Sequence, residues 1–146
     1  VKYLELSQHR LTDYKFTWDK MLAFQGNTAP YLQYSYVRTR SIFRKLEGTA
    51  DLTGPYALTE KEERALALIL CQFAEAVPLV LTDFRPNVLA GYIYEAARAF
   101  HSFFEACPVL RAEGVARATR LALCEATSRV LKTGLDLMGI RVTERM

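Results

Sequence analysis

The segment EGVARATRLALCEATSRVLKTGLDLM, residues 113–138, predicts one long amphipathic helix. Side chains at the spacing of a single helix face recur along it; they are Leu121, Cys124, Ser128, Leu131, Leu135 and Met138. Ser128 is the one polar member of this stripe and is small enough to lie in a seam between helices. Gly139 follows directly and supplies a C-terminal stop. A helix with such a stripe must be covered by other elements, so the segment favours a layered helical domain.

Two other segments carry clear helix signals. A helix is expected over about residues 30–46, with Asn27 or Thr28 as its N-cap. Another is expected over about residues 86–106, because Pro86 suits the first turn of a helix. These two segments and the first one are long enough to form the body of a bundle.

A further helix is expected between them. Residues 59–62, TEKE, have the spacing of a capping box, with Thr59 as the cap and Glu62 three residues later. Apolar residues then repeat at helical spacing, namely Leu66, Ile69, Leu70 and Phe73. Pro78 is expected to kink or divide this helix, which leaves a second piece toward Leu81.

No segment alternates strictly between apolar and polar residues, so no strand is predicted. Residues 1–25 are less regular, and residues 14–18 indicate an extended stretch. The fold class is therefore predicted to be all-α: a helical bundle of four to five main helices with an irregular N-terminal lead-in.

Composition sets the broad class of the chain. Of its 146 residues, 51% are hydrophobic and 24% are charged, a balance typical of one soluble globular domain. No uninterrupted apolar run approaches the ~18–20 residues that cross a bilayer, so no membrane is expected. The chain begins with Val and lacks the apolar region of a signal peptide, which suggests a piece of a longer protein.

Charge and cysteine content give weak functional signals. The formal net charge of +3 is too small to indicate nucleic acid by itself, although most of the cations are arginines, which suit forked contacts to phosphate or carboxylate. Cys71, Cys107 and Cys124 lie among apolar residues without CxxC spacing, so three buried reduced thiols are expected rather than a metal site. Motifs for phosphate, dinucleotide, nucleophilic serine and zinc are absent, so no catalytic residue is predicted.

Residues 26–40, GNTAPYLQYSYVRTR, combine tyrosine with arginine. At ~100° per residue, Tyr31, Tyr34 and Arg38 share one face of the expected helix, and Tyr36 lies with Arg40 on another. Tyrosine rings beside guanidinium groups suit unstacked bases and their phosphates. The alternative interpretation is that the rings fill the seam between helices, and composition alone favours this alternative.

A second aromatic cluster lies on the helix expected over residues 86–106. Phe100, Phe103 and Cys107 are expected to face the core. Phe104 is displaced by one helical step and is expected to be exposed.

Several of these stretches resemble the anticodon-binding domain of arginyl-tRNA synthetases. The opening helix of that domain is similar to residues 26–34, GNTAPYLQY, followed by Arg38 and residues 41–42, SI. Its later helices are similar to residues 92–95, YIYE, 103–105, FFE, 107–110, CPVL, 120–124, RLALC, and 134–140, GLDLMGI. The resemblance covers essentially the whole chain.

The resemblance implies that residues 26–146 form an α-helical anticodon-binding domain and that residues 1–25 lead in from the end of a catalytic domain. It implies a cytoplasmic class I ligase that joins arginine to tRNA-Arg with ATP and magnesium. That chemistry lies in an upstream domain, and neither of its ATP-binding signatures occurs here. This chain is therefore expected to hold no cofactor and no metal, to be non-catalytic alone, to bind tRNA rather than DNA, and to be monomeric.

The resemblance also implies which residues contact the anticodon loop; they are Tyr31, Tyr34, Arg38, Phe104 and Met146. Many family members carry Tyr where Phe104 stands, and the phenylalanine keeps a stacking face without the phenolic hydrogen bond. Met146 would pack on the central base, while its terminal carboxylate would accept a hydrogen bond from a cytosine amine. Arg38 and nearby arginines would neutralise phosphates.

Two other functions remain open from the sequence. A helical protein-interaction or assembly module would use an exposed apolar helix face and would dimerise with concentration. A cofactor-binding bundle that uses His101 is a third hypothesis, which a colourless, metal-free preparation would exclude.

Overall fold

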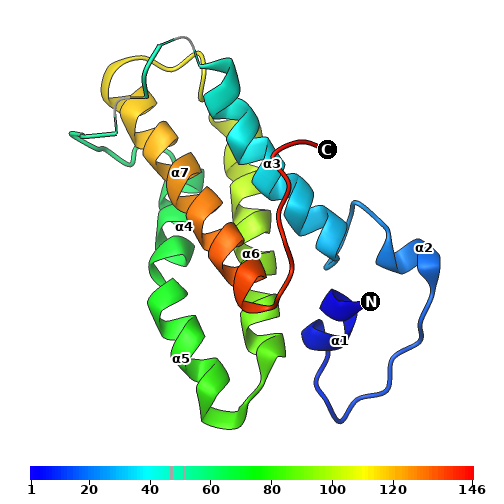
Figure 1. The fold of residues 1–146 in the computed structure, drawn as a ribbon. Helices are drawn as coiled ribbons and strands as arrows, with labels where there is room; N and C mark the ends of the chain where they lie inside the picture. Colours follow the sequence, from blue (N-terminus) through cyan, green and yellow to red (C-terminus); the bar gives the residue numbers. More distant parts are fainter. Residues whose placement is uncertain (47, 51) are drawn as a thin grey trace.

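The computed structural model describes residues 1–46, 48–50 and 52–146. Every regular element in this part of the chain is a helix, and no strand occurs in it. The helices are α1 (Lys2–Ser7), α2 (Trp18–Met21), α3 (Ala29–Lys45), α4 (Lys61–Cys71), α5 (Phe73–Asp83), α6 (Pro86–Ala106) and α7 (Gly114–Leu137). Figure 1 shows α3, α6, α7 and the α4–α5 pair as an elongated bundle, with α1 and α2 to one side of it. The predicted all-α bundle of four to five main helices is confirmed.

The beginning of α3 follows the local sequence signals. Thr28 is its N-cap, and the Thr28 Oγ1 atom accepts a hydrogen bond from the Tyr31 backbone N–H at 3.2 Å. The same hydroxyl donates to the Ala23 carbonyl at 2.6 Å, which closes the loop that precedes the helix. Residues at the end of α7 also behave as predicted, because Gly139 has a positive φ of 66° directly after the helix.

The capping box of α4 lies one residue later than predicted. The N-cap is Glu60, and its partner is Glu63. The Glu63 carboxylate accepts hydrogen bonds from the backbone N–H groups of Thr59 and Glu60, at 2.9 and 3.1 Å. It also forms an ion pair with the Arg120 Nε atom of α7 at 2.7 Å. This contact, distant in sequence, favours Glu63 over Glu62 as the capping-box partner.

The expected division at Pro78 is wrong. The helix is interrupted earlier, at Gln72, whose N–H turns to the Ile69 carbonyl at 3.2 Å, and Pro78 lies inside α5. Pro78 and Ala74, whose carbonyl loses its donor, are both exposed. Water can therefore satisfy that carbonyl, and the helix tolerates the proline.

The stretch Lys61–Asp83, which contains α4 and α5, passes a length and composition test for a membrane span. An 18-residue window in it has a mean hydropathy of 2.0, and 11% of that window is buried. The prediction that no stretch reaches this length counted uninterrupted apolar residues, which Gln72 and Glu75 break. A single helix of this kind is weak support for a membrane, but it leaves an apolar surface exposed on this side of the bundle.

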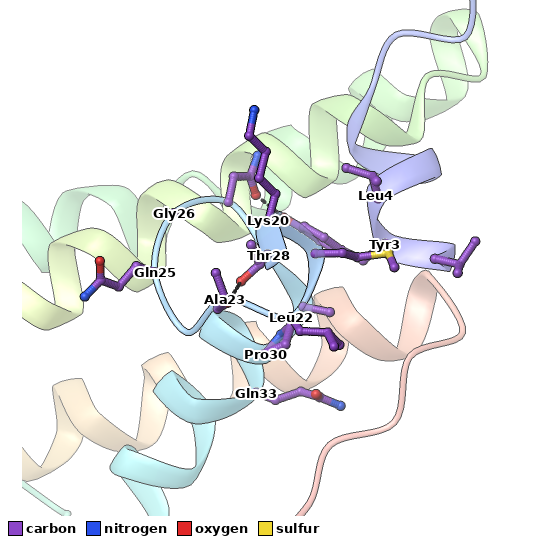
Figure 2. A pocket seen from close by; sticks show the side chains of 14 residues that line it. Tyr3, Leu4, Lys20, Leu22, Ala23, Gln25, Gly26, Thr28, Pro30 and Gln33 are labelled. Atoms are coloured by element: carbon purple, nitrogen blue, oxygen red, sulfur yellow. Dashed lines mark hydrogen bonds between the residues drawn. The ribbon is translucent and has the colours of Figure 1, made fainter. Parts of the chain in front are cut away.

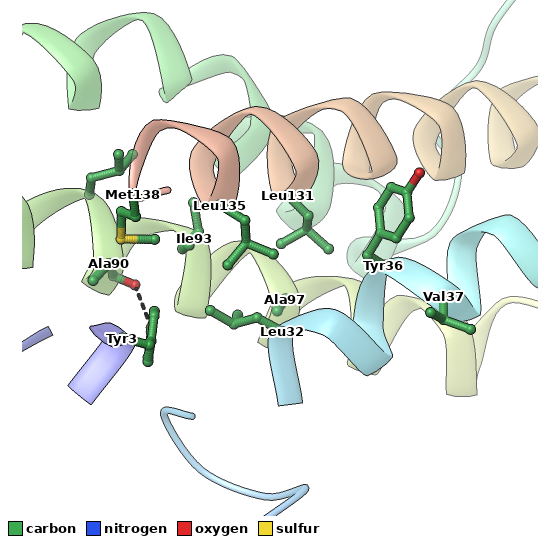
Figure 3. Packing of buried hydrophobic residues seen from close by; sticks show 11 residues of the cluster. Tyr3, Leu32, Tyr36, Val37, Ala90, Ile93, Ala97, Leu131, Leu135 and Met138 are labelled. Atoms are coloured by element: carbon green, nitrogen blue, oxygen red, sulfur yellow. Dashed lines mark hydrogen bonds between the residues drawn. The ribbon is translucent and has the colours of Figure 1, made fainter. Parts of the chain in front are cut away.

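The core lies where three long helices meet. Figure 3 shows Leu32 of α3, Ile93 of α6 and Leu135 of α7 pointing toward one another, and all three are fully buried. A second cluster surrounds Phe100 and Phe103 at the other end of α6. Burial of these rings and aliphatic side chains stabilises the bundle by about 1.5–3 kcal/mol for each large side chain.

The lead-in is more ordered than predicted. Residues 2–7 form α1, which packs on α6. Tyr3 of α1 is buried, and its hydroxyl donates to the Ala90 carbonyl at 3.3 Å and to Asn27. Of the stretch expected to be extended, residues 14–17 have no regular structure, whereas Trp18 begins α2. The helical turn was missed because four residues carry too little periodicity to be recognised.

Two of the three thiols are buried as predicted. Cys107 and Cys124 are buried, and burial raises the pKa of each thiol, so both are poor nucleophiles. Cys71 is exposed, which corrects the expectation of three buried thiols. Its apolar neighbours do not indicate burial here, because the outer face of α4 is itself apolar and exposed. Ser128 is buried in the helix seam, as its place in the stripe predicted.

Candidate functional site

The two faces predicted for α3 are both confirmed. Tyr31, Tyr34 and Arg38 line one cavity together. Tyr36 is turned to the other side, where its hydroxyl donates to the Glu144 carboxylate at 2.8 Å and Arg40 approaches the same carboxylate at 3.7 Å. One helix therefore uses one tyrosine for packing and offers two others to a cavity.

The cavity on this face, called cavity A below, has a volume of about 200 Å³. Its wall is largely aromatic, and the Tyr34 side chain there is 40% exposed. It is lined by Phe24, Gln25, Tyr31, Tyr34, Ser35, Arg38, Phe100 and His101. Flat apolar rings beside one cation form a surface on which planar, electron-rich groups stack.

Arg38 is held in place from several directions. Its Nη2 donates to the Tyr34 hydroxyl at 2.9 Å, and its Nη1 lies 2.8 Å from the Nδ1 atom of His101. Its guanidinium carbon lies 4.8 Å from the ring centroid of Tyr34 and 5.0 Å from that of Phe104. The guanidinium is thus both hydrogen-bonded and stacked, which fixes its plane.

His101 is oriented by the residue one turn further along α6. An arginine can only donate, so the Nδ1 atom of His101 accepts from Arg38, and the ring proton lies on Nε2. That Nε2 atom lies 3.2 Å from the Glu105 carboxylate, which accepts from it. Glu105, His101 and Arg38 therefore form a chain of contacts that ends in cavity A.

Tyr31 is the more enclosed tyrosine of cavity A. Its ring packs edge-on against Tyr94 of α6, with the ring centroids 5.8 Å apart. Burial raises the pKa of Tyr31, and Tyr94 adds to this effect against the opposing influence of Arg98 and Arg38. The phenol stays protonated at neutral pH and can donate a hydrogen bond.

Phe104 lies on the border of cavity A and lines a different, adjacent cavity. It is 36% exposed, whereas Phe100, Phe103 and Cys107 are buried, so the predicted division of this face is confirmed. Its ring packs on Phe100 with the centroids 6.0 Å apart. The Arg38 guanidinium thus lies between Phe104 on one side and Tyr31 and Tyr34 on the other.

Met146 lines neither of these two cavities and is 59% exposed. The tail before it runs along α3, as Figure 1 shows. Gln33 donates to the Arg141 carbonyl and Arg44 to the Glu144 carbonyl, both at 2.7 Å. These contacts bring the tail to α3 without bringing Met146 to Tyr34 or Arg38, so its role remains a prediction.

Sequence reasoning missed two ring-bearing residues of cavity A that contact Tyr34 and Arg38. Phe24 faces Tyr34 edge-on with the ring centroids 6.3 Å apart, because the loop closed by Thr28 brings it there. His101 was considered only as an isolated histidine, since its partner Arg38 is 63 residues away. A single sequence holds no signal for that pairing.

A larger cavity of about 510 Å³ lies where the lead-in meets α3. Figure 2 shows side chains of Tyr3, Leu4 and Lys20 around it, with Gln25 on the far side of the Gly26 loop. Gln25 lines this cavity and cavity A, so the loop between α2 and α3 forms a shared wall. The described residues contain no group of three or more His, Cys, Asp or Glu side chains placed to hold a metal ion.

A sequence model of the DALR anticodon binding domain matches residues 32–146. The chain belongs to this family. Arginine–tRNA ligases of Haemophilus ducreyi and Pseudoalteromonas translucida are 52% and 53% identical to this chain over its whole length. The chain spans about a quarter, 26%, of the length of each of these curated relatives.

Solved structures agree with the assignment of the DALR domain. The arginyl-tRNA synthetase of Plasmodium falciparum matches with a TM-score of 0.87 and 35% identity over 99% of this chain and 26% of its own. The Thermus thermophilus enzyme matches with a TM-score of 0.82 and 36% identity over the same shares. The resemblance noted from the sequence motifs is confirmed.

Proposed function

We propose that this DALR domain is the anticodon-binding part of an arginine–tRNA ligase and that cavity A receives an unpaired base of the anticodon loop of tRNA-Arg. The observation that carries the proposal is Arg38, fixed by Tyr34 and His101 between two aromatic rings. Such an arrangement stacks a base and favours its electronegative edge. Family membership and the relatives' names support the choice of RNA over other planar ligands.

In this mechanism the loop opens and its bases leave their stack. The central base and its neighbours stack on Tyr31, Tyr34 and Phe104, each stacked ring contributing about 1–3 kcal/mol. Arg38 contacts the base edge or a phosphate, and nearby arginines neutralise phosphates of the RNA backbone. Met146 packs on the central base once the loop is bound, and its terminal carboxylate accepts a hydrogen bond from the cytosine amine.

The contribution of the domain to the reaction is positional. Binding energy gained at the anticodon orients the acceptor end of the tRNA in the rest of the ligase, a contribution to rate made without touching the reacting atoms. ATP and magnesium belong to that other part, since this sequence carries neither ATP signature. We place the ligase in the cytoplasm and expect it to act as a monomer.

The proposal is tested by fluorescence anisotropy with two anticodon stem-loops, one of which has its central cytosine replaced. The intact ligase is titrated with both RNAs at several salt concentrations. Preferential binding of the cytosine-bearing loop supports an anticodon reader. Equal binding of the two loops contradicts it and leaves only a weakly basic helical surface.

A second candidate function is contact with another protein surface. The observation that favours it is the exposed apolar side of α4 and α5, where Leu68, Leu79 and Phe84 are all exposed. Within the ligase, this side would serve to dock the domain on the remaining three quarters of the protein. Sedimentation velocity of the isolated chain over a range of concentrations tests self-association, and a constant sedimentation coefficient counts against it.

A further inference from the structure

Residues 140–146, called the tail below, follow α7 and lie beside α3 (Figure 1). Ile140 and Val142 of the tail are partly buried and pack on the core cluster that contains Leu32. The attachment that follows is Glu144, because both its carboxylate and its backbone carbonyl bind side chains of α3. The tail is therefore attached to the bundle to within two residues of Met146.

The groups that hold Glu144 are themselves fixed, although the Glu144 side chain is 68% exposed. Its carboxylate accepts a hydrogen bond at 2.8 Å from Tyr36, whose ring is buried in the core. Burial and this hydrogen bond raise the pKa of Tyr36, so the phenol stays protonated and donates at neutral pH. Arg40 lies 3.7 Å from the same carboxylate and is also bound at 3.2 Å by Glu125 of α7. Arg44 donates to the Glu144 carbonyl at 2.7 Å.

The three side chains that hold Glu144 are spread around α3. At ~100° per residue, Arg40 and Arg44 lie about 40° and about 80° from Tyr36, on the side of the helix that leads to Tyr34. The carbonyl carbon of Glu144, whose oxygen Arg44 holds, is bonded to the nitrogen of the next residue. The last two residues therefore start from the Arg44 side of α3, which is closer to cavity A than the Tyr36 side.

The attachment of Glu144 limits the positions that Met146 can reach. Two residues span at most about 7 Å, whereas the four residues that follow Val142 span about 14 Å. Loss of the contacts at Glu144 would therefore enlarge the volume open to Met146 about 8-fold. A side chain that is already confined near its binding partner loses less conformational freedom on binding, so the contacts of Glu144 favour any contact that Met146 makes.

We propose that Glu144 is a positioning residue for anticodon readout, which holds Met146 at the place where the central base of the loop arrives. This inference rests on the proposed function and deepens it. Glu144 acts through Met146 and makes no contact with the RNA itself. Tyr36 and Arg40 lie away from cavity A, and through Glu144 they contribute to base recognition as well as to packing.

The test compares variants of the intact ligase that release Glu144 to different extents. Glu144→Ala removes the carboxylate, Tyr36→Phe removes the phenolic hydroxyl and keeps the ring, and Glu144→Gln still offers an oxygen to Tyr36. Asp136→Ala is the matched control, since it removes one negative charge at an exposed position of α7. Thermal melting checks that every variant is folded. If Tyr36→Phe melts early, Arg44→Ala at an exposed residue releases the Glu144 carbonyl instead.

The attachment of the tail is measured first, without RNA, by brief digestion with trypsin. Mass spectrometry follows cleavage after Arg141 in the tail, with cleavage after exposed Arg10 of the lead-in as the internal reference. Glu144→Ala is expected to speed the cleavage after Arg141 about 5-fold, because the detached state gains the value of one net hydrogen bond. Glu144→Gln is expected to have a smaller effect, and Asp136→Ala none.

Binding is then measured by anisotropy with two anticodon stem-loops, one with the central cytosine and one with that base replaced. Glu144→Ala is expected to weaken binding of the cytosine-bearing loop about 5-fold and to leave the replaced loop almost unchanged, so that discrimination falls. In a ligase truncated after Arg145, which lacks Met146, Glu144→Ala is expected to cause no further loss, because the two changes act through one contact. A general disturbance of the fold would instead weaken both loops equally.

Three results overturn the inference, and they are distinguishable. Unchanged cleavage after Arg141 in Glu144→Ala shows that Glu144 does not hold the tail. Faster cleavage with full discrimination of the central base shows that the attached tail has no part in readout, while the proposed function stands. Failure of the wild type to discriminate the central base removes the proposed function, and the positioning role of Glu144 with it.

Discussion

Gly134 of α7 lies so close to Ile93 of α6 that a Cβ atom at position 134 would stand 2.4 Å from the Cγ2 atom of Ile93. Real Cβ atoms do not approach other atoms so closely, so the two helices pack at a distance that only glycine permits. Ile93 is fully buried. The close packing of α6 against α7 therefore requires a residue without a Cβ atom at position 134.

Gly134→Ala is expected to destabilise the domain by about 1–3 kcal/mol, because overpacking outweighs the gain of about 1 kcal/mol in helix propensity. Urea unfolding measures the change. Gly91→Ala is the matched control, since nothing lies within 4 Å of a Cβ at that helical position. The control should be neutral or stabilising, and a stabilising effect at both positions would contradict the clash.

Glu63→Gln tests the buried ion pair with Arg120. The Glu63 side chain is fully buried and that of Arg120 is 13% exposed, so loss of the charge leaves a cation without its partner. A loss of about 3 kcal/mol in unfolding free energy is expected at pH 7. Lys61→Ala, in the same helical turn but exposed, should change stability by less than about 0.5 kcal/mol.

The effect of Glu63→Gln should also depend on pH. Burial by itself would raise the pKa of Glu63, but the hydrogen bonds from Arg120 and from the backbone of Glu60 and Thr59 lower it overall. A carboxylate whose pKa is lower in the folded state stabilises the fold above its ordinary pKa of 4.5, and this contribution is lost as the pH falls through the folded value. The difference in melting temperature between wild type and variant should therefore shrink in acid; a constant difference would refute the charge argument.

Tyr34→Ala should weaken anticodon-loop binding by about 10-fold with little change in melting temperature, because Tyr34 is 40% exposed and lines cavity A rather than the core. Tyr36→Ala is the contrasting variant. Its ring is buried and its hydroxyl binds Glu144, so it should lose about 3–5 kcal/mol of stability. A sharp fall in melting temperature for Tyr34→Ala would mean that Tyr34 is a packing residue.

His101→Ala should loosen Arg38 and lower anticodon-loop affinity by about 10-fold, the value of a hydrogen bond to a charged group. His101→Gln can still offer an acceptor to the guanidinium and should recover part of the loss. Ser102→Ala, at the neighbouring exposed position, serves as the control. Anisotropy titrations with equal affinities for all three variants would exclude a positioning role for His101.

Local signals predicted the parts of this molecule that depend on neighbours in sequence. Thr28 caps α3 through its own hydroxyl, and the burial of Phe103 beside the exposure of Phe104 follows from helical geometry alone. The misplaced capping box has the opposite origin, because Glu63 is chosen by Arg120, 57 residues away. Arg38 and His101 likewise meet only after α3 and α6 pack. The sequence therefore predicted Tyr31 and Tyr34 at the candidate site, but not the contact with His101 that orients the Arg38 guanidinium.

The uneven burial of the three thiols provides a ready attachment point for a reporter. Cys71 is exposed on α4, whereas Cys107 and Cys124 are enclosed and held as unreactive thiols by burial. A maleimide dye added at neutral pH should therefore modify a single position of the chain without any engineered cysteine. Because Cys71 lines neither cavity A nor the adjacent cavity lined by Phe104, a dye there would report rotational diffusion while leaving the stacking surfaces unmodified.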